Sequence, residues 1–394
     1  MRSRSPSLAA AVAAFALLIS CTEQLQNPGA PTEPTLAKGG PGVKSVNVTP
    51  SSASIAVNGT VQLTATASPP KAATNGFTWS TTNAAVATVS SSGLVTGVSA
   101  GTATIRATSG AATGASTITV TTTPPPSNDP VLIGAGDIAK CSVTGDEATA
   151  NLLDNIAGTV FTLGDNVYDS GTATEYTNCY GPSWGRHRSR TAPTPGNHEY
   201  NTPNATGYYG YFGSAAGDPN KGYYSYDLGN WHIIVLNSNS SCTTISCAAG
   251  SAQDTWLRAD LAAHTNVCTL AYWHHPRFNS GAAHGNNTAV SNFWDALYLY
   301  GADVVLNGHE HVYERFAPQT PGAVADPTNG IRQFTVGTGG ASHYTFGTIK
   351  ANSQVREGNT YGVLKLTLHA TSYDWQFVPV AGATFTDSGT GNCH

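Results

Sequence analysis

Side chains able to bind metal ions follow apolar runs at several points in the second two thirds of the chain. The runs and the groups after them are 131–135 before Asp137, 159–163 before Asp165, 269–273 before His274, and 302–306 before His309. Continuous apolar runs of this length are typical of buried strands. Because the carboxyl ends of parallel strands meet at one rim of a sheet, we expect these side chains to lie close together.

The complete set of candidate donors consists of oxygen and nitrogen ligands only. Its members are Asp137, Asp165, Tyr168, Asn197, His198, His274, His309 and His311. A single member has an ordinary explanation, such as a helix cap or a turn. Together they predict two hard or borderline metal ions that share Asp165 as a bridging carboxylate, with a bridging hydroxide at neutral pH.

Helical segments separate the apolar runs. The segments 146–156, 252–263 and 291–300 are expected to be helices. Alternation of buried strands and helices predicts an α/β sandwich whose strand ends carry the chemistry.

Five sequence blocks resemble the metallophosphoesterases (the calcineurin-like superfamily), in family order and most closely in the purple acid phosphatase branch. They are Gly136-Asp137, Gly164-Asp165-Asn166-Val167-Tyr168, Gly196-Asn197-His198-Glu199, His274-His275-Pro276 and Gly308-His309-Glu310-His311. Many members have D-x-H in the first block, whereas this chain has Asp137-Ile138-Ala139, so Tyr168 would replace the missing histidine. The resemblance covers residues 131–394 and implies a four-layer α/β/β/α catalytic domain.

The resemblance also implies a ligand set. The first metal would be Fe(III), because a phenolate such as that of Tyr168 favours a trivalent ion; the second would be Zn(II), Fe(II) or Mn(II). The ligands would be Asp137, Asp165, Tyr168 and His311 for the first metal, and Asp165, Asn197, His274 and His309 for the second. The reaction would be hydrolysis of a small phosphomonoester by attack of a metal-bound hydroxide, with no covalent enzyme intermediate.

Two histidines are candidates for orienting phosphate and protonating the leaving group. His198 adjoins Asn197, and His284 lies ten residues beyond His274 in a glycine-containing loop. His275 is a weaker candidate, because neighbouring residues on a strand point in opposite directions.

The N-terminus has the features of an export signal. Arg2 and Arg4 precede an apolar run that ends at Cys21. The run resembles the lipobox of bacterial lipoproteins, which implies a lipoprotein signal peptide over residues 1–20 and a lipid on Cys21. Thr22 resembles the outer-membrane sorting pattern. We therefore expect an exported protein, periplasmic or on the cell surface, whose contact with a membrane is only this anchor; a secreted form stays open.

A second domain precedes the catalytic one. Residues 21–42 are predicted to be a flexible tether, 43–121 a small β-sandwich and 122–130 a proline-rich linker. The sandwich resembles bacterial Ig-like domains of group 2, and Trp79 is expected to fill its core. Because residues 34–128 contain no Asp, Glu or His, this domain has no carboxylate or imidazole for catalysis. A spacer role is favoured over weak surface or glycan contact.

Cysteine usage fits an exported chain. Six cysteines remain besides Cys21, and six allow fifteen pairings. The pairing we expect, in which each bridge holds a loop or the C-terminus, is Cys141 with Cys179, Cys242 with Cys247, and Cys268 with Cys393.

Net charge narrows the function classes. The formal net charge is -5, from 18 basic and 23 acidic residues. This charge provides no positive potential that would attract nucleic acid, so nucleic-acid binding is not expected to be the main function. An exported phosphatase is the leading hypothesis. Two alternatives stay open: hydrolysis of phosphodiesters or nucleotides at the same metals, and a surface adhesion protein with a vestigial metal domain.

Overall fold

The computed structural model describes residues 43–69, 76–121, 129–266 and 268–394. The expected signal peptide, Cys21 and the tether lie outside these residues, as does most of the proline-rich linker. The chain divides into two compact units, residues 1–127 and 128–394. In the described part of the chain, no helix is long and apolar enough to span a bilayer.

The first unit is an all-β sandwich. Its strands are β1 (Ser45–Thr49), β2 (Ser52–Ala56), β3 (Thr60–Gln62), β4 (Thr64–Ser68), β5 (Thr78–Thr81), β6 (Ala87–Val89), β7 (Leu94–Gly97), β8 (Gly101–Ser109) and β9 (Ala112–Thr121). The main sheet has the order β2-β9-β8-β5, and β3-β7-β6 forms a smaller one. Alternation along β8 and β9 places Ala103, Ile105, Ile118 and Val120 in the core.

Trp79 does not fill this core, contrary to the expectation from the sequence. It is partly buried and packs against the core residues, and a Cβ on Gly93 would lie 2.8 Å from its ring. Small and β-branched side chains from β8 and β9 already occupy the centre, so the indole packs beside them over the flat glycine backbone.

The second unit contains two large sheets. The strands of the six-stranded sheet, in spatial order, are β14 (Thr191–Ala192), β12 (Thr159–Thr162), β10 (Val131–Ala135), β22 (Gly362–Leu368), β23 (Ser372–Pro379) and β24 (Ser388–Asn392). Those of the seven-stranded sheet are β15 (Tyr224–Leu228), β16 (Trp231–Val235), β17 (Cys268–Tyr272), β18 (Val304–Asn307), β20 (Arg332–Val336), β19 (Tyr313–Phe316) and β21 (Ser353–Glu357). β11 (Ala139–Lys140) and β13 (Val167–Tyr168) form a short parallel pair.

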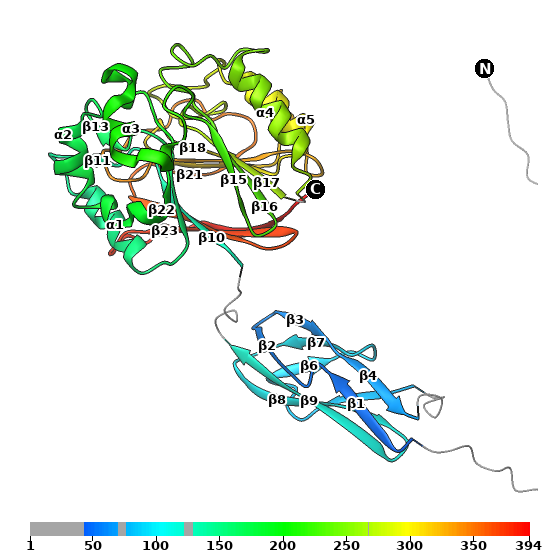
Figure 1. The fold of residues 1–394 in the computed structure, drawn as a ribbon. Coiled ribbons are helices and arrows are strands. Elements are labelled where there is room, and N and C mark those ends of the chain that lie inside the picture. The colour runs from blue at the N-terminus through cyan, green and yellow to red at the C-terminus, as the bar shows by residue number, and fades with distance from the viewer. Residues whose placement is uncertain (1–42, 70–75, 122–128, 267) are drawn as a thin grey trace, which may run out of the picture. The chain divides into compact units, whose positions relative to one another are not determined.

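The two sheets pack face to face, with helices outside them (Figure 1). Side chains from β10, β12, β16, β17, β18 and β22 share one core. The helices are α1 (Gly145–Asp154), α2 (Ala173–Glu175), α3 (Thr206–Phe212), α4 (Ala252–Ala263) and α5 (Ser291–Leu299). The second core lies between the seven-stranded sheet and α4 and α5, while α1 packs against β22. The expected α/β/β/α fold class is confirmed.

All three expected disulfides are present: Cys141–Cys179, Cys242–Cys247 and Cys268–Cys393. The last bridge attaches the C-terminus to β17 across a sequence separation of 125 residues.

Candidate metal centre

The candidate donors follow parallel strands of both sheets. β10 and β12 run parallel in one sheet, and β17 and β18 run parallel in the other. Asp137, Asp165 and His309 lie just beyond β10, β12 and β18, each with a positive φ of 59°, 47° and 69° respectively. Non-glycine residues seldom adopt this left-handed conformation, which costs about 1–3 kcal/mol per residue. Residues strained in this way are concentrated at functional sites.

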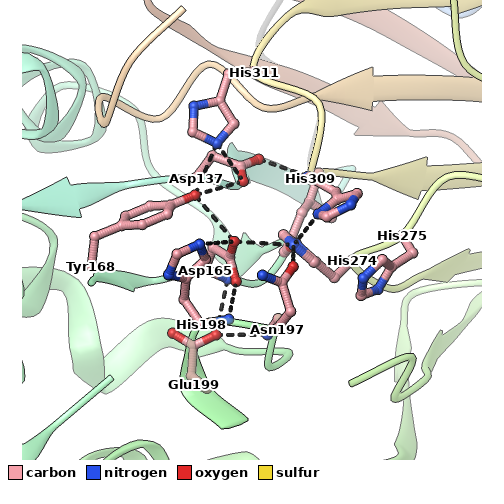
Figure 2. Close-up of polar contacts among 12 residues, drawn as sticks. Asp137, Asp165, Tyr168, Asn197, His198, Glu199, His274, His275, His309 and His311 are labelled. Atoms are coloured by element: carbon pink, nitrogen blue, oxygen red, sulfur yellow. Dashed lines mark hydrogen bonds and ion pairs between the residues drawn. The ribbon is translucent and has the colours of Figure 1, made fainter. Parts of the chain in front are cut away.

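One group of donors surrounds the Tyr168 hydroxyl (Figure 2). The hydroxyl lies 2.9 Å from Oδ1 of Asp137, 3.2 Å from Oδ2 of Asp165 and 3.0 Å from Nε2 of His311. Nε2 of His311 is also 3.3 Å from Oδ1 of Asp137. A phenol has one hydrogen to donate, so it cannot satisfy all three neighbours.

A second group surrounds Nε2 of His274. This nitrogen lies 3.0 Å from Oδ1 of Asn197, 3.1 Å from Nδ1 of His309 and 3.2 Å from Oδ2 of Asp165. Nδ1 of His274 donates to the carbonyl of Leu163 at 2.7 Å, which directs Nε2 toward the group.

Oδ2 of Asp165 belongs to both groups, so a single carboxylate oxygen joins two sets of four donors. Ligands that bind one metal at about 2.0–2.2 Å lie about 3 Å from one another. The other donors of each group lie 2.9–3.2 Å from the Tyr168 hydroxyl or from Nε2 of His274. The donor set therefore fits two adjacent cations.

The electrostatics of the site favour cations as well. Asp137 and Asp165 are 0 % and 2 % exposed. Among the described residues, neither forms an ion pair with Lys or Arg; their cationic partners are histidines. Burying carboxylates is costly, and bound metal ions would offset that cost.

The pKa shifts of the side chains at the site reflect the same crowding. Burial opposes protonation of His274, but the Asp165 carboxylate outweighs it and raises the pKa of His274 to about 9. Burial also raises the pKa of Tyr168 well above its ordinary value, and Asp137 and Asp165 add to this effect. A phenolate ligand at this position therefore requires a strongly polarising cation.

His198 lies at the edge of the first group. Its ring packs on Tyr168 with centroids 4.4 Å apart, and its backbone N–H donates to Oδ1 of Asp165 at 2.8 Å. Nδ1 contacts the carbonyl of Asp169 at 2.7 Å and must carry a proton to do so. Nε2 is then directed toward the site, 3.9 Å from Oδ2 of Asp165.

His284 and His275 both flank His309. The His284 ring stacks on His309 with centroids 3.9 Å apart, and the His275 ring lies 4.2 Å from it. Strand alternation does not distinguish His275 from His274, because β17 ends at Tyr272 and both histidines lie in the bend beyond it. His275 is buried, and its Nδ1 contacts the Ser238 hydroxyl at 2.8 Å.

Residues given no role from the sequence support the donors. The buried Glu199 carboxylate accepts the backbone N–H groups of Asp165, Asn166 and Gly196, at 2.9, 2.8 and 2.6 Å. Its place in the Gly196–Glu199 block was a signal for this role. Ser342 contacts Nδ1 of His311 at 2.7 Å, and nothing in the sequence around it indicates this contact.

Two family matches correspond to the two units. Residues 131–313 match the calcineurin-like phosphoesterases, and residues 42–120 match the bacterial Ig-like domains of group 2. Residues 131–313 are thus similar to one phosphoesterase family, and residues 42–120 to a family of Ig-like domains.

Similar proteins include plant enzymes. Purple acid phosphatase 15 of Arabidopsis thaliana is 28% identical over 227 residues, which are 48% of this chain and 42% of the relative. Purple acid phosphatase 23 of the same plant is 26% identical over 263 residues, 57% of this chain and 56% of the relative. The chain thus spans about half the length of these two relatives.

Solved structures support the fold. A purple acid phosphatase from yellow lupin (Lupinus luteus) seeds superposes with a TM-score of 0.55 at 16% identity, covering 84% of this chain and 67% of that one. GAP50, described as the anchor in the inner membrane complex of Plasmodium, gives a TM-score of 0.53 at 12% identity, covering 68% and 89%. An anchor protein shares this fold, so the fold alone does not determine activity.

Proposed function

We propose that the chain is an exported phosphatase that hydrolyses phosphomonoesters at a dinuclear metal centre. One observation carries the proposal: Oδ2 of Asp165 lies 3.2 Å from both the Tyr168 hydroxyl and Nε2 of His274. This oxygen is positioned to bridge two cations, and a pair of adjacent cations suits the binding of a phosphate ester.

Each of the two donor groups would bind one metal ion. Asp137, Asp165, Tyr168 and His311 would hold Fe(III), while Asp165, Asn197, His274 and His309 would hold Zn(II), Fe(II) or Mn(II). When bound, two such ions polarise phosphoryl oxygens and make a water molecule nucleophilic near neutral pH. Asn197 offers a neutral carbonyl oxygen instead of a third carboxylate, which leaves net positive charge for the phosphate.

His198 orients the ester and protonates the leaving group. Its Nδ1 proton is held by the Asp169 carbonyl and its Nε2 is directed toward the donors, so the imidazolium form would transfer its Nε2 proton to the leaving oxygen and remain a neutral imidazole with the hydrogen on Nδ1. The imidazole is 30% exposed, so it can contact a substrate arriving from solvent. His284, which stacks on His309, is proposed as the second group that faces the phosphate.

Export and anchoring belong to the same proposal. Three disulfides favour an oxidising compartment outside the cytoplasm. Lipidation of Cys21 would hold the chain at the outer membrane, and the Ig-like domain would act as a spacer between that anchor and the catalytic domain.

The test uses purified mature protein. We expect two metal ions per chain, one of them iron, a broad visible absorption band, and turnover of p-nitrophenyl phosphate that exceeds turnover of bis-p-nitrophenyl phosphate. Preference for the diester would replace the phosphomonoesterase by a phosphodiesterase. Absence of bound metal and of both activities would contradict the enzyme and favour the adhesion protein.

A further inference from the structure

Glu310 is a buried carboxylate between two proposed metal ligands, yet it contacts neither metal group. It is 0% exposed and accepts from three backbone or amide donors of the loop 279–285. These are Nδ2 of Asn279 at 2.7 Å, the N–H of Ala283 at 3.0 Å and the N–H of His284 at 3.1 Å. The Glu310 carboxylate therefore holds the loop 279–285 through three hydrogen bonds.

The same carboxylate also contacts the ring of His284. Oε2 of Glu310 lies 3.3 Å from Nδ1 of His284. The Glu310 oxygens already accept hydrogens from Nδ2 of Asn279 and from the N–H groups of Ala283 and His284, so the carboxylate acts as an acceptor toward the ring as well. Nδ1 must then carry a hydrogen. Within the described residues Nε2 of His284 forms no hydrogen bond, and it is left for an external group.

Two further contacts fix where this ring lies. His284 stacks on His309 with an interplanar angle of 30°, and 36% of its side chain is exposed. A Cβ on Gly281 would lie 2.0 Å from Cδ of Glu310, so only glycine allows the loop to approach the carboxylate this closely. The ring is thus held against a proposed metal ligand while one edge faces solvent.

We propose that Glu310 is a positioning residue: it holds His284 over His309 with the proton on Nδ1, so that Nε2 faces the phosphate ester. This inference rests on the proposed function and deepens it, because it explains why the ring of the partly exposed His284 has a single orientation. A carboxylate that fixes the tautomer of a functional imidazole is a recurrent device, worth about 10- to 100-fold when lost.

Glu314 provides a matched control. It is also 0% exposed and accepts from the same loop, at the N–H of Ser280 (2.8 Å), and from the Ser353 hydroxyl, but it does not contact His284. Glu314→Gln therefore tests the cost of altering a buried carboxylate beneath this loop without altering the tautomer of His284.

The experiment is a double-mutant cycle on the full-length, metal-loaded protein. We expect Glu310→Gln to lower kcat/KM for p-nitrophenyl phosphate about tenfold, to weaken binding of inorganic phosphate measured by calorimetry, and to leave the metal content unchanged. In a His284→Ala background the same change should cost nothing further. Glu314→Gln should have a small and equal effect in both backgrounds.

Three results would overturn the inference. They are an equal cost of Glu310→Gln with and without His284, loss of metal from Glu310→Gln, and equal losses of activity and melting temperature in the Glu310 and Glu314 variants. Failure of the proposed function would look different, because the unmodified metal-loaded protein would then hydrolyse no phosphate ester.

Discussion

The carboxylate of Glu199 accepts the backbone N–H of Asp165 at 2.9 Å, and thereby fixes the backbone of the residue proposed to bridge the two metals. The same carboxylate accepts from Asn166, from Gly196 and from the hydroxyl of the buried Tyr176. A buried acceptor of this kind fixes the backbone that carries two proposed ligands, Asp165 and Asn197, without contacting a metal itself.

Replacing Glu199 should therefore weaken metal binding. In Glu199→Gln an amide NH₂ would face backbone N–H groups, and we expect metal affinity to fall about 10- to 100-fold, with a loss of about 1–3 kcal/mol in stability. Competition with a chelator measures the affinity. Glu147→Gln, at a half-exposed surface carboxylate, is the control. Metal affinity unchanged in Glu199→Gln would contradict this role.

Asn197 should be needed for the second metal alone. Its Oδ1 lies 3.0 Å from Nε2 of His274 and is not among the contacts of Tyr168. We expect Asn197→Ala to retain iron, to lose most of the divalent ion and to lose at least about 100-fold in turnover. Elemental analysis of the purified variant checks the stoichiometry. Asn201→Ala, at an exposed amide bonded to Asp169, should keep both metals.

Tyr168→Phe separates the phenolate from the packing of its ring. The ring would still stack on His198, but the oxygen shared by Asp137, Asp165 and His311 would be gone. We expect the visible absorption band to disappear and iron affinity to fall, with a folded protein of nearly unchanged circular dichroism. A band that persists in the variant would show that the colour does not come from Tyr168.

The ion pairs formed by the buried His232 predict a pH-dependent stability. Nδ1 and Nε2 of His232 lie 2.9 Å from Asp227 and 2.8 Å from Asp260. Burial lowers the pKa of His232, but the two carboxylates outweigh it, so the folded-state pKa is raised. Its contribution to stability is thus fully present below the ordinary histidine pKa of about 6.5 and is lost as the pH rises through the folded-state value.

His232→Gln should then destabilise more in acid than in alkali. We expect a loss of about 1–3 kcal/mol at about pH 5, shrinking toward about pH 9, as measured by thermal unfolding of both proteins. The same difference in melting temperature at both pH values would show that the charge on His232 contributes nothing.

Two disulfides allow a comparison of loop lengths. Cys268–Cys393 spans 125 residues and Cys242–Cys247 spans 5. In the chain-entropy account, the longer loop should contribute about 3 kcal/mol more. Denaturant unfolding of the two double alanine variants measures this difference, and equal losses would favour an enthalpic origin.

The candidate metal ligands could be predicted from the sequence, whereas the residues that hold histidines of the site in place could not. Asp137, Asp165, His274 and His309 follow apolar runs, and that pattern is local, so the strand ends can be located without a structure. Ser342 and Glu310 act through contacts with residues 31 and 26 positions away. No periodicity encodes such contacts, and the bend after β17 likewise removed the basis for separating His274 from His275.

The Ig-like domain has an unusual composition of ionisable groups. Residues 43–121 contain no Asp, Glu, His, Cys or Tyr, the side chains whose ordinary pKa values lie between acid and about pH 10. Its free energy of unfolding should therefore show almost no proton linkage over that range. In a calorimetric experiment on the whole chain, a transition that moves with pH or with chelator would belong to the catalytic domain, and the Ig-like domain would serve as an internal reference.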